Sequence, residues 1–142
     1  MFFTIFYYFR NYEDMGVAHT ERLNGVHPDL CRVVYRASEL AYLKGIDITV
    51  AEGLRSKGRQ QQLFELGKSK TLNSKHLIGE AVDIYPIIEK KIAWDRFSDL
   101  ALCMFQAAYE LSVPVEWGGD WKMRDCPHWQ LSKVVEKSEK SE

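Results

Sequence analysis

Apolar residues recur at steps of three and four between residues 28 and 44, which is the spacing of an amphipathic helix with one buried face. Pro28 suits the first turn of this helix, and Gly45 ends it. The same spacing over residues 92–111 predicts a long helix. Residues 57–66 are rich in Gln, Leu and Glu and predict a shorter one. The chain therefore offers three helices for packing.

Alternating apolar and polar residues, typical of strands with one buried face, occupy two short segments. Residues 46–50 and 80–85 alternate in this way, and we expect Pro86 to end the second strand. Further short strands are predicted at 113–117 and 129–131. Helices and short strands together predict an α+β fold, in which the helices pack against a small, mostly antiparallel sheet.

Length and composition describe one globular domain. The chain has 142 residues, of which 46% are hydrophobic and 13% aromatic, enough for a single core. Its formal charge of −1 lacks the broad basic field that nucleic acid or an anionic membrane surface would require. We assign residues 20–132 to the domain, 1–19 to an N-terminal extension and 133–142 to a charged, flexible tail. Nothing in the sequence demands more than a monomer.

Cysteine content and the N-terminus bear on where the protein is made. Three cysteines are too few and too scattered for a disulfide framework, which favours synthesis in a reducing compartment. The apolar segment of residues 1–9 is too short to span a bilayer. A signal peptide has basic residues before its apolar region, and no basic residue precedes this segment. We therefore expect cytoplasmic synthesis without a signal peptide and no stable membrane insertion.

Two segments place histidine near acidic residues. His76 precedes Asp83 by seven positions, and Gly79 between them permits a sharp bend. Farther along the chain, His128 supplies a third potential donor. Two imidazoles and one carboxylate suit zinc and would leave its fourth position open to water. A lone histidine is more often a solvated polar residue, so spacing alone leaves that alternative open.

Asp125 lies three residues before His128. Because Pro127 favours a polyproline-like backbone, we expect the two side chains on one side of the chain, with their Cα atoms about 9 Å apart. A carboxylate there could take a proton from attacking water and pass it to a departing amine. Arg55, just past a predicted strand, could stabilise the oxyanion on the attacked carbonyl. Taken alone, Asp125 is more often a turn residue.

Cys126 permits a competing interpretation, a closed structural zinc site with His76, Asp83 and His128. The period-three geometry that aligns residues 125 and 128 would turn its thiol elsewhere, which favours the open site. Two further features have ordinary structural interpretations. Trp117 suits the core or a cleft wall, and the glutamine run that starts at Gln60 suits a solvated helix face.

With these residues in view, the chain resembles the M15 family of zinc peptidases, specifically its branch of phage and bacterial L-alanyl-D-glutamate endopeptidases. The resemblance covers roughly residues 20–131. It is carried by Glu52-Gly53-Leu54-Arg55-Ser56, Ser74-Lys75-His76-Leu77-Ile78-Gly79-Glu80-Ala81-Val82-Asp83, Trp117-Gly118-Gly119-Asp120-Trp121 and Asp125-Cys126-Pro127-His128-Trp129-Gln130-Leu131. The fold that it implies is that of the D-Ala-D-Ala peptidases and hedgehog-like zinc domains.

The resemblance also implies roles for single residues. The ligands of one zinc ion per chain would be His76, Asp83 and His128, the catalytic base would be Asp125, and Arg55 would assist the transition state. Substrate contacts are expected from Ser74, Gln60 and Trp117.

The function implied is zinc-dependent hydrolysis of an amide in the peptidoglycan stem peptide, at the L-Ala–D-Glu bond, as in an endolysin that reaches the wall after membrane permeabilisation. One alternative is a D-Ala-D-Ala carboxypeptidase or dipeptidase. Another is a non-catalytic zinc-binding interaction domain, which would have no use for a base at Asp125.

Overall fold

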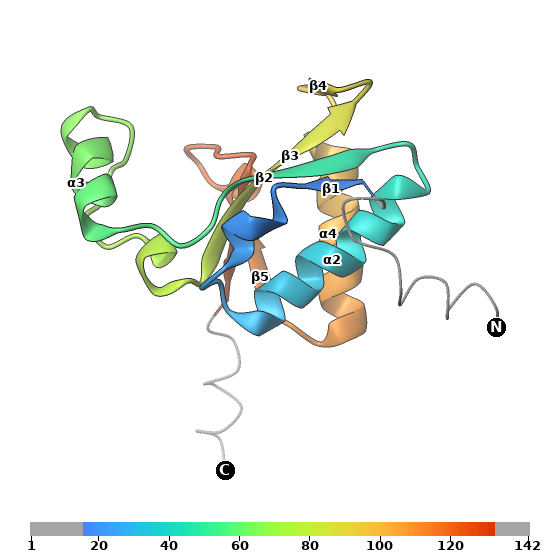
Figure 1. Cartoon of the computed structure of the whole chain (residues 1–142), viewed down its shortest axis with the longest axis horizontal. Coiled ribbons are helices and arrows are strands. Elements are labelled where there is room, and N and C mark those ends of the chain that lie inside the picture. The colour runs from blue at the N-terminus through green and yellow to red at the C-terminus, as the bar shows by residue number, and fades with distance from the viewer. Residues whose placement is uncertain (1–15, 133–142) are drawn as a thin grey trace, which may run out of the picture.

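A computed structural model of the chain describes residues 16–132 (Figure 1). Its elements, in chain order, are β1 (Val17–Ala18), η2 (Thr20–Leu23), α2 (Pro28–Tyr42), β2 (Asp47–Glu52), α3 (Lys57–Glu65), η3 (Lys75–Ile78), β3 (Ala81–Ile88), β4 (Lys91–Ile92), α4 (Phe97–Leu111), β5 (Val115–Trp117), η4 (Gly118–Asp120) and β6 (His128–Leu131). The predicted tail at 133–142 and residues 1–15 lie outside the described part. Within that part, no helix has the length and apolar character needed to cross a bilayer.

The strands form one mixed sheet in the order β1-β2-β3-β6-β5, with β4 paired to the far end of β3. The pairing of β1 with β2 is parallel, and the other pairs are antiparallel. This architecture confirms the predicted α+β fold. Val17 is only 1% exposed, so the part of the expected N-terminal extension that is described belongs to the sheet and the core.

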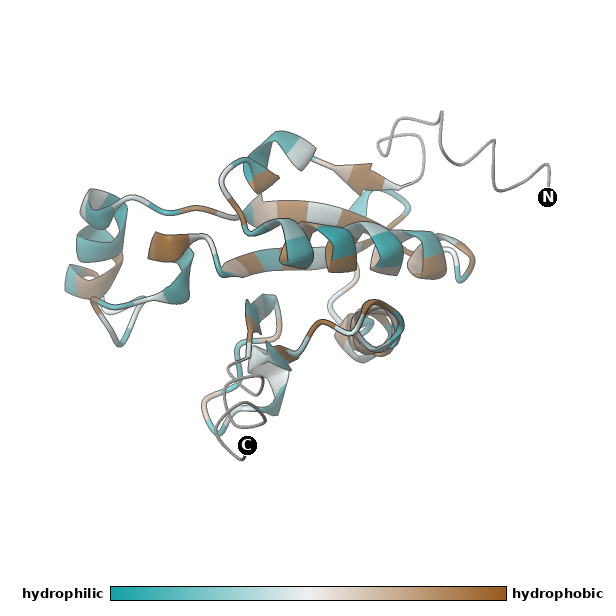
Figure 2. Ribbon diagram, turned by 90° about the horizontal axis from the view of Figure 1, so that it is seen from below, coloured by the Kyte–Doolittle hydropathy of each residue, from teal (hydrophilic) through white to brown (hydrophobic). Residues whose placement is uncertain are grey.

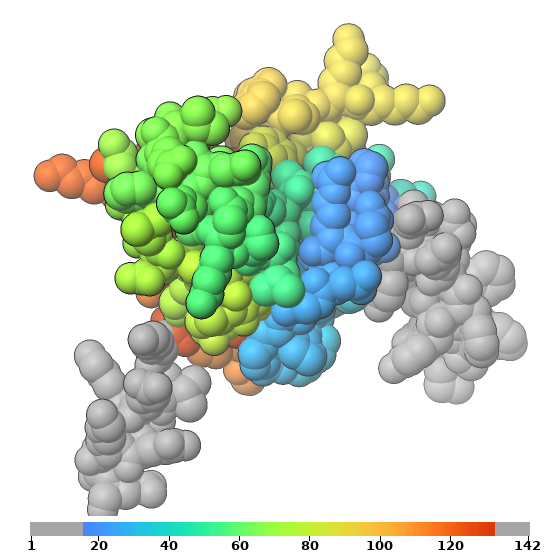
Figure 3. Space-filling model, turned by 60° about the vertical axis from the view of Figure 1, so that its left-hand side comes forward, coloured from blue at the N-terminus to red at the C-terminus, as the bar shows by residue number. Residues whose placement is uncertain are grey.

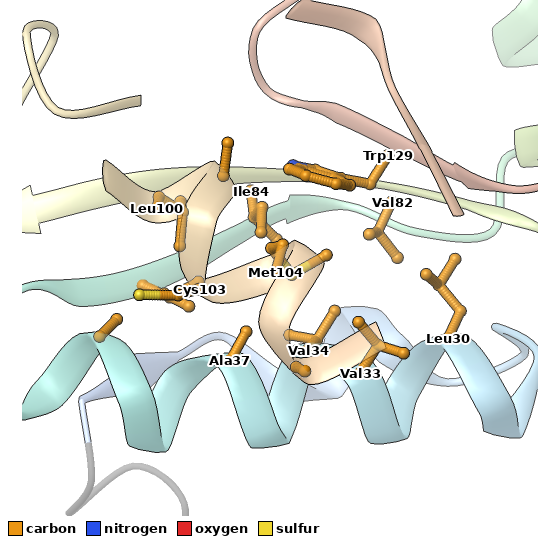
Figure 4. Close-up of a cluster of buried hydrophobic side chains, with 14 of the residues drawn as sticks. Leu30, Val33, Val34, Ala37, Val82, Ile84, Leu100, Cys103, Met104 and Trp129 are labelled. Carbon is orange, nitrogen blue, oxygen red and sulfur yellow. The ribbon is translucent and has the colours of Figure 1, made fainter. Parts of the chain in front are cut away.

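The core lies where α2 and α4 meet the sheet (Figure 4). Hydrophobic and hydrophilic positions share the length of α2, as Figure 2 shows, and its apolar face turns inward. The buried side chains come from both helices and from β3 and β6: Leu30, Val33, Val34, Ala37, Val82, Ile84, Leu100, Cys103, Met104 and Trp129. Burial of a large aliphatic side chain stabilises a fold by about 1.5–3 kcal/mol, so this layer fixes the strands that carry the site. Helix α3 stands apart from α2 and α4 at the other end of the sheet (Figure 1).

Helix α4 begins later than expected. The apolar spacing predicted a helix from residue 92, but α4 starts at Phe97. Residues 91 and 92 instead pair with the end of β3 as the short strand β4. Trp94 then packs edge-on against Tyr85, with ring centroids 5.9 Å apart. The helical spacing was therefore misleading at residue 92, which belongs to the hairpin of β3 and β4.

Pro86 does not end its strand, contrary to expectation, because β3 continues to Ile88. The carbonyl of Pro86 accepts a hydrogen bond of 2.8 Å from the N–H of Ala93, on the side away from β2. Since the nitrogen and the carbonyl of a strand residue point to the same side, the missing N–H removes no bond to β2.

Candidate active site

The sheet register brings Asp83 and His128 together. They are directly opposite each other in the antiparallel pair of β3 with β6. His76 belongs to η3, which leads into β3, and all three side chains offer donor atoms within 4.8 Å of one another. The predicted convergence of a loop imidazole, a strand carboxylate and a second imidazole is therefore present in the structure.

Gly79 supplies the bend that returns the chain from η3 to β3. It has a φ of 72°, and a Cβ atom there would lie 2.2 Å from the carbonyl oxygen of Gly25. Only glycine fits both the left-handed conformation and this close approach. At the other end of η3, the Ser74 hydroxyl accepts a 3.2 Å hydrogen bond from the N–H of His76. Ser74 thus holds His76 and also lines the adjoining cleft.

The donor atoms are spaced as metal ligands. Oδ1 of Asp83 lies 3.4 Å from Nε2 of His76 and 3.3 Å from Nδ1 of His128. Ligands about 2.0–2.1 Å from a tetrahedral zinc ion are separated by about 3.3 Å. Nε2 of His76 and Oδ1 of Asp83 are buried and lack a hydrogen-bond partner within residues 16–132. Buried polar atoms without partners are costly, and a divalent cation would satisfy both. The residues present therefore fit a metal ion.

Each imidazole is held by its other ring nitrogen. Nδ1 of His76 lies 2.8 Å from the carbonyl oxygen of Gly53, and Nε2 of His128 lies 2.9 Å from Oε1 of Gln130. Because both partners are acceptors, each of these nitrogens carries the proton, which leaves a lone pair on the nitrogen facing Asp83. The amide of Gln130 is itself fixed by a 3.1 Å hydrogen bond that it donates to Glu116.

Charge in this cluster is strongly coupled. Burial tends to raise the pKa of Asp83, but its interactions with His128 and His76 outweigh burial and hold the pKa well below its usual range. Burial tends to lower the pKa of His128, yet Asp83 and the Gln130 side chain raise it overall. The metal-free site is therefore an ionised carboxylate between two imidazoles.

Asp125 lines the same cleft as the three donors. The polyproline geometry expected for this segment is wrong. The carbonyl of Asp125 accepts a 3.1 Å hydrogen bond from the N–H of His128, so residues 125–128 form a tight turn whose end Cα atoms lie closer than the expected ~9 Å. Burial and the nearby Asp83 carboxylate raise the pKa of Asp125, although His128, His76 and Arg55 oppose this shift. A carboxylate with a raised pKa accepts a proton more readily.

Arg55 is a largely buried cation that already forms an ion pair with Glu52. Its side chain is 9% exposed, and its Nε and Nη2 each donate a 2.7 Å hydrogen bond to Glu52. Nη1 donates to Oε1 of Gln60 at 2.8 Å, and Nη2 lies 3.8 Å from Oδ2 of Asp83. This pairing with Glu52, which spacing alone did not indicate, fixes the guanidinium at the edge of the cleft and lowers the pKa of Glu52.

Gln60, expected as a substrate contact and as part of a solvated helix face, is buried and does not line the cleft. Its side chain is 1% exposed, and its Nε2 donates to the Ser69 hydroxyl and the Thr71 carbonyl at 2.9 and 2.6 Å. These contacts use both N–H groups of the amide, and Oε1 accepts the hydrogen bond from Arg55. Gln60 therefore holds the Arg55 guanidinium in place through a hydrogen bond.

Trp117, also expected as a substrate contact, does not line the cleft. Its ring is 8% exposed, stacks on Trp129 at 5.7 Å and donates from Nε1 to the carbonyl of Cys126 at 2.7 Å. Trp121 takes the cleft position instead, with its ring 5.0 Å from that of His128. Both tryptophans flank the Gly118-Gly119-Asp120 turn, so the sequence does not distinguish the buried ring from the exposed one.

The proposed closed site with Cys126 does not form. Among the described histidine, cysteine and acidic residues, the cluster of potential metal donors comprises His76, Asp83 and His128 and leaves out Cys126. The adjoining cleft has a volume of about 880 Å³. The loop after α3 lines one side, and Trp121, Met123, Arg124 and Asp125 line another. Figure 3 looks onto this end of the molecule, where α3 appears in green.

A small α+β domain with three converging donors and a carboxylate beside them is typical of mononuclear metal-dependent hydrolases. A family model described as phage L-alanyl-D-glutamate peptidase matches residues 13–135. The chain belongs to this family, which confirms the resemblance carried by its motifs and its assignment to the peptidases.

Individual relatives agree with this assignment. The L-alanyl-D-glutamate peptidase of Escherichia phage T5 is 30% identical over 124 residues, which cover 83% of this chain and 88% of the relative. The peptidoglycan L-alanyl-D-glutamate endopeptidase CwlK of Bacillus subtilis is 32% identical over 126 residues, covering 75% and 73%. The crystal structure of the L-Ala D-Glu endopeptidase ChiX of Serratia marcescens matches with a TM-score of 0.73 at 42% identity, covering 79% and 84%.

Proposed function

We propose that this protein is a zinc-dependent peptidase that hydrolyses the L-Ala–D-Glu bond of the peptidoglycan stem peptide. The observation that carries the proposal is the His76–Asp83–His128 cluster, which has unpartnered buried Nε2 and Oδ1 atoms and lines a cleft that is also lined by Asp125. We further propose that it acts on the cell wall as a monomer, after the membrane has been permeabilised.

In this proposal His76, Asp83 and His128 hold one zinc ion, which when bound supplies Lewis-acid activation of water and of the scissile carbonyl. Asp125 accepts the proton of the attacking water and delivers it to the departing amine. Arg55 keeps two of its five N–H groups outside its three hydrogen bonds and offers positive charge near the developing oxyanion. Ser74 keeps His76 in place through its backbone N–H.

The test is mass spectrometry of muropeptides after incubation with zinc-loaded protein, alongside Asp125→Ala. We expect new L-Ala C-termini and D-Glu N-termini from the wild type. The variant should bind zinc but turn over about 10²–10⁴ times more slowly, the usual contribution of general acid–base catalysis. Released D-Ala would indicate a carboxypeptidase or dipeptidase instead. Uncut sacculi and muropeptides would favour a non-catalytic zinc-binding domain.

A further inference from the structure

The cleft carries more positive charge than the proposed chemistry uses. The whole chain has a formal charge of −1, yet basic residues outnumber acidic ones along the cleft. The basic residues are Arg55, Lys68, Lys70, Lys75 and Arg124, and the acidic ones are Glu52, Asp83 and Asp125. Arg55 and Lys75 are paired with Glu52 and Glu80. Among residues 16–132, Lys68, Lys70 and the Nη atoms of Arg124 have no ion-pair partner.

Arg124 differs from the two lysines because its guanidinium is anchored. Its Nε donates a 3.0 Å hydrogen bond to the carbonyl of Gly119. The backbone at Gly119 packs closely against the buried ring of Trp117, since a Cβ atom there would lie 2.3 Å from that ring. Both Nη atoms lack hydrogen-bond partners in the described part of the chain, and the residue lines the cleft beside Asp125. The structure thus presents an oriented guanidinium next to the proposed base.

The bond of the proposed function places an anion at this point. In the stem peptide, D-Glu is linked onward through its side-chain carboxyl group, so its α-carboxylate stays free. The carbon of that carboxylate is two bonds from the scissile nitrogen, which puts its oxygens within about 4 Å of that atom. Asp125 must approach the same nitrogen to deliver a proton. Two carboxylates would then lie close together, which is unfavourable unless a cation accompanies them.

We propose, as an inference resting on the proposed function, that Arg124 is a specificity determinant that binds the free α-carboxylate of D-Glu. The planar guanidinium matches a carboxylate through two parallel hydrogen bonds. Arg55 is less suited, because Glu52 already occupies this fork. The exposed Lys68 and Lys70 on another side of the cleft contribute attraction that salt screens.

The experiment compares two synthetic stem peptides, one with D-Glu and one with D-isoglutamine, in which the α-carboxylate is an uncharged carboxamide. Zinc-loaded wild type should cleave the D-Glu peptide with a kcat/KM roughly 10- to 100-fold higher, the range expected for a charge-assisted bidentate contact. Arg124→Gln should lose this advantage on the D-Glu peptide and leave the D-isoglutamine rate unchanged. Lys122→Gln removes the same charge from an exposed residue that does not line the cleft, and should change neither rate.

Two results would overturn the assignment of Arg124. One is a wild type that cleaves both peptides equally, and the other is an Arg124→Gln variant that loses the same factor on both. Thermal unfolding of each variant separates these results from a folding defect. Wild type that cuts neither peptide, nor purified sacculi, would contradict the proposed function itself. The failure of the inference and the failure of the function are therefore distinguishable.

Discussion

Nη1 of Arg55 donates a 2.8 Å hydrogen bond to Oε1 of Gln60, and this contact joins a cation of the candidate active site to helix α3. The other end of the Gln60 amide binds Ser69 and Thr71 in the loop that lines the cleft. Helix α3 stands apart from the other helices (Figure 1), and Gln60 is one of its two buried residues. A single buried amide thus links this outlying segment to the strand end that carries Arg55.

Replacement of Gln60 by Leu should lower the free energy of unfolding by about 1–3 kcal/mol, because the guanidinium of Arg55 and the carbonyl of Thr71 each lose a partly buried hydrogen bond. We also expect faster hydrogen exchange over residues 68–72 and a lower kcat/KM, measured by exchange mass spectrometry and peptide hydrolysis. Gln62→Leu is the matched control, since Gln62 is exposed on the same helix. Equal effects of the two changes would contradict the linking role of Gln60.

Zinc should stabilise the protein through the three donors. A ligand at about 100 times its dissociation constant adds about 2.7 kcal/mol to the free energy of unfolding. We expect added zinc to raise Tm in the wild type and His128→Ala to abolish most of that rise, as measured by thermal unfolding with and without chelator. His19→Asn changes an exposed histidine outside the cluster and should keep the full effect. A full zinc response in His128→Ala would exclude this residue as a ligand.

The elements that sequence predicted well are those whose pattern is long and determined by one buried face. The apolar spacing found α2, and alternation found the segments of β2 and β3 that pair with each other. The two-residue strand β1 was missed, because a pair of residues has no period to detect. The boundaries of α4 and β3 were wrong where β4 and a hydrogen bond at Pro86 supplied tertiary contacts.

The site shows a similar division. The three donors lie together as their spacing predicted, because glycine and the sheet register leave the chain few alternatives. Asp125 lines the same cleft, but a tight turn places it there and not the polyproline geometry expected from its spacing. Supporting residues were not predicted: Gln130 on His128 and Glu52 on Arg55 are ordinary polar residues until the fold places them. The positions of Gln60 and Trp117 away from the cleft lining were not predicted, because burial of a polar or aromatic side chain depends on long-range packing.

The metal-free protein should be most stable in a window of mildly acidic pH. The lowered pKa of Asp83 contributes stability that is present above its ordinary value of 3.8 and lost as the pH falls below it. The raised pKa of His128 contributes stability that is present below its ordinary value of 6.5 and lost as the pH rises through the folded-state pKa. Urea unfolding with chelator should show a maximum between these values, and Asp83→Asn should flatten it. Zinc should shift the maximum upward, because the ion competes with protons for the imidazoles.

Gly79 provides a direct test of how the bend holds His76. Gly79→Ala should destabilise the protein by about 2–4 kcal/mol, because it combines the cost of a left-handed alanine with a clash of its Cβ against the carbonyl of Gly25. Gly67 has the same φ of 72° but open space around its Cβ position, so Gly67→Ala should cost only about 1–2 kcal/mol. Urea unfolding measures both, and zinc titration should show weaker binding in Gly79→Ala alone. Equal destabilisation by the two substitutions would mean that conformation, rather than the close approach to Gly25, requires glycine at this bend.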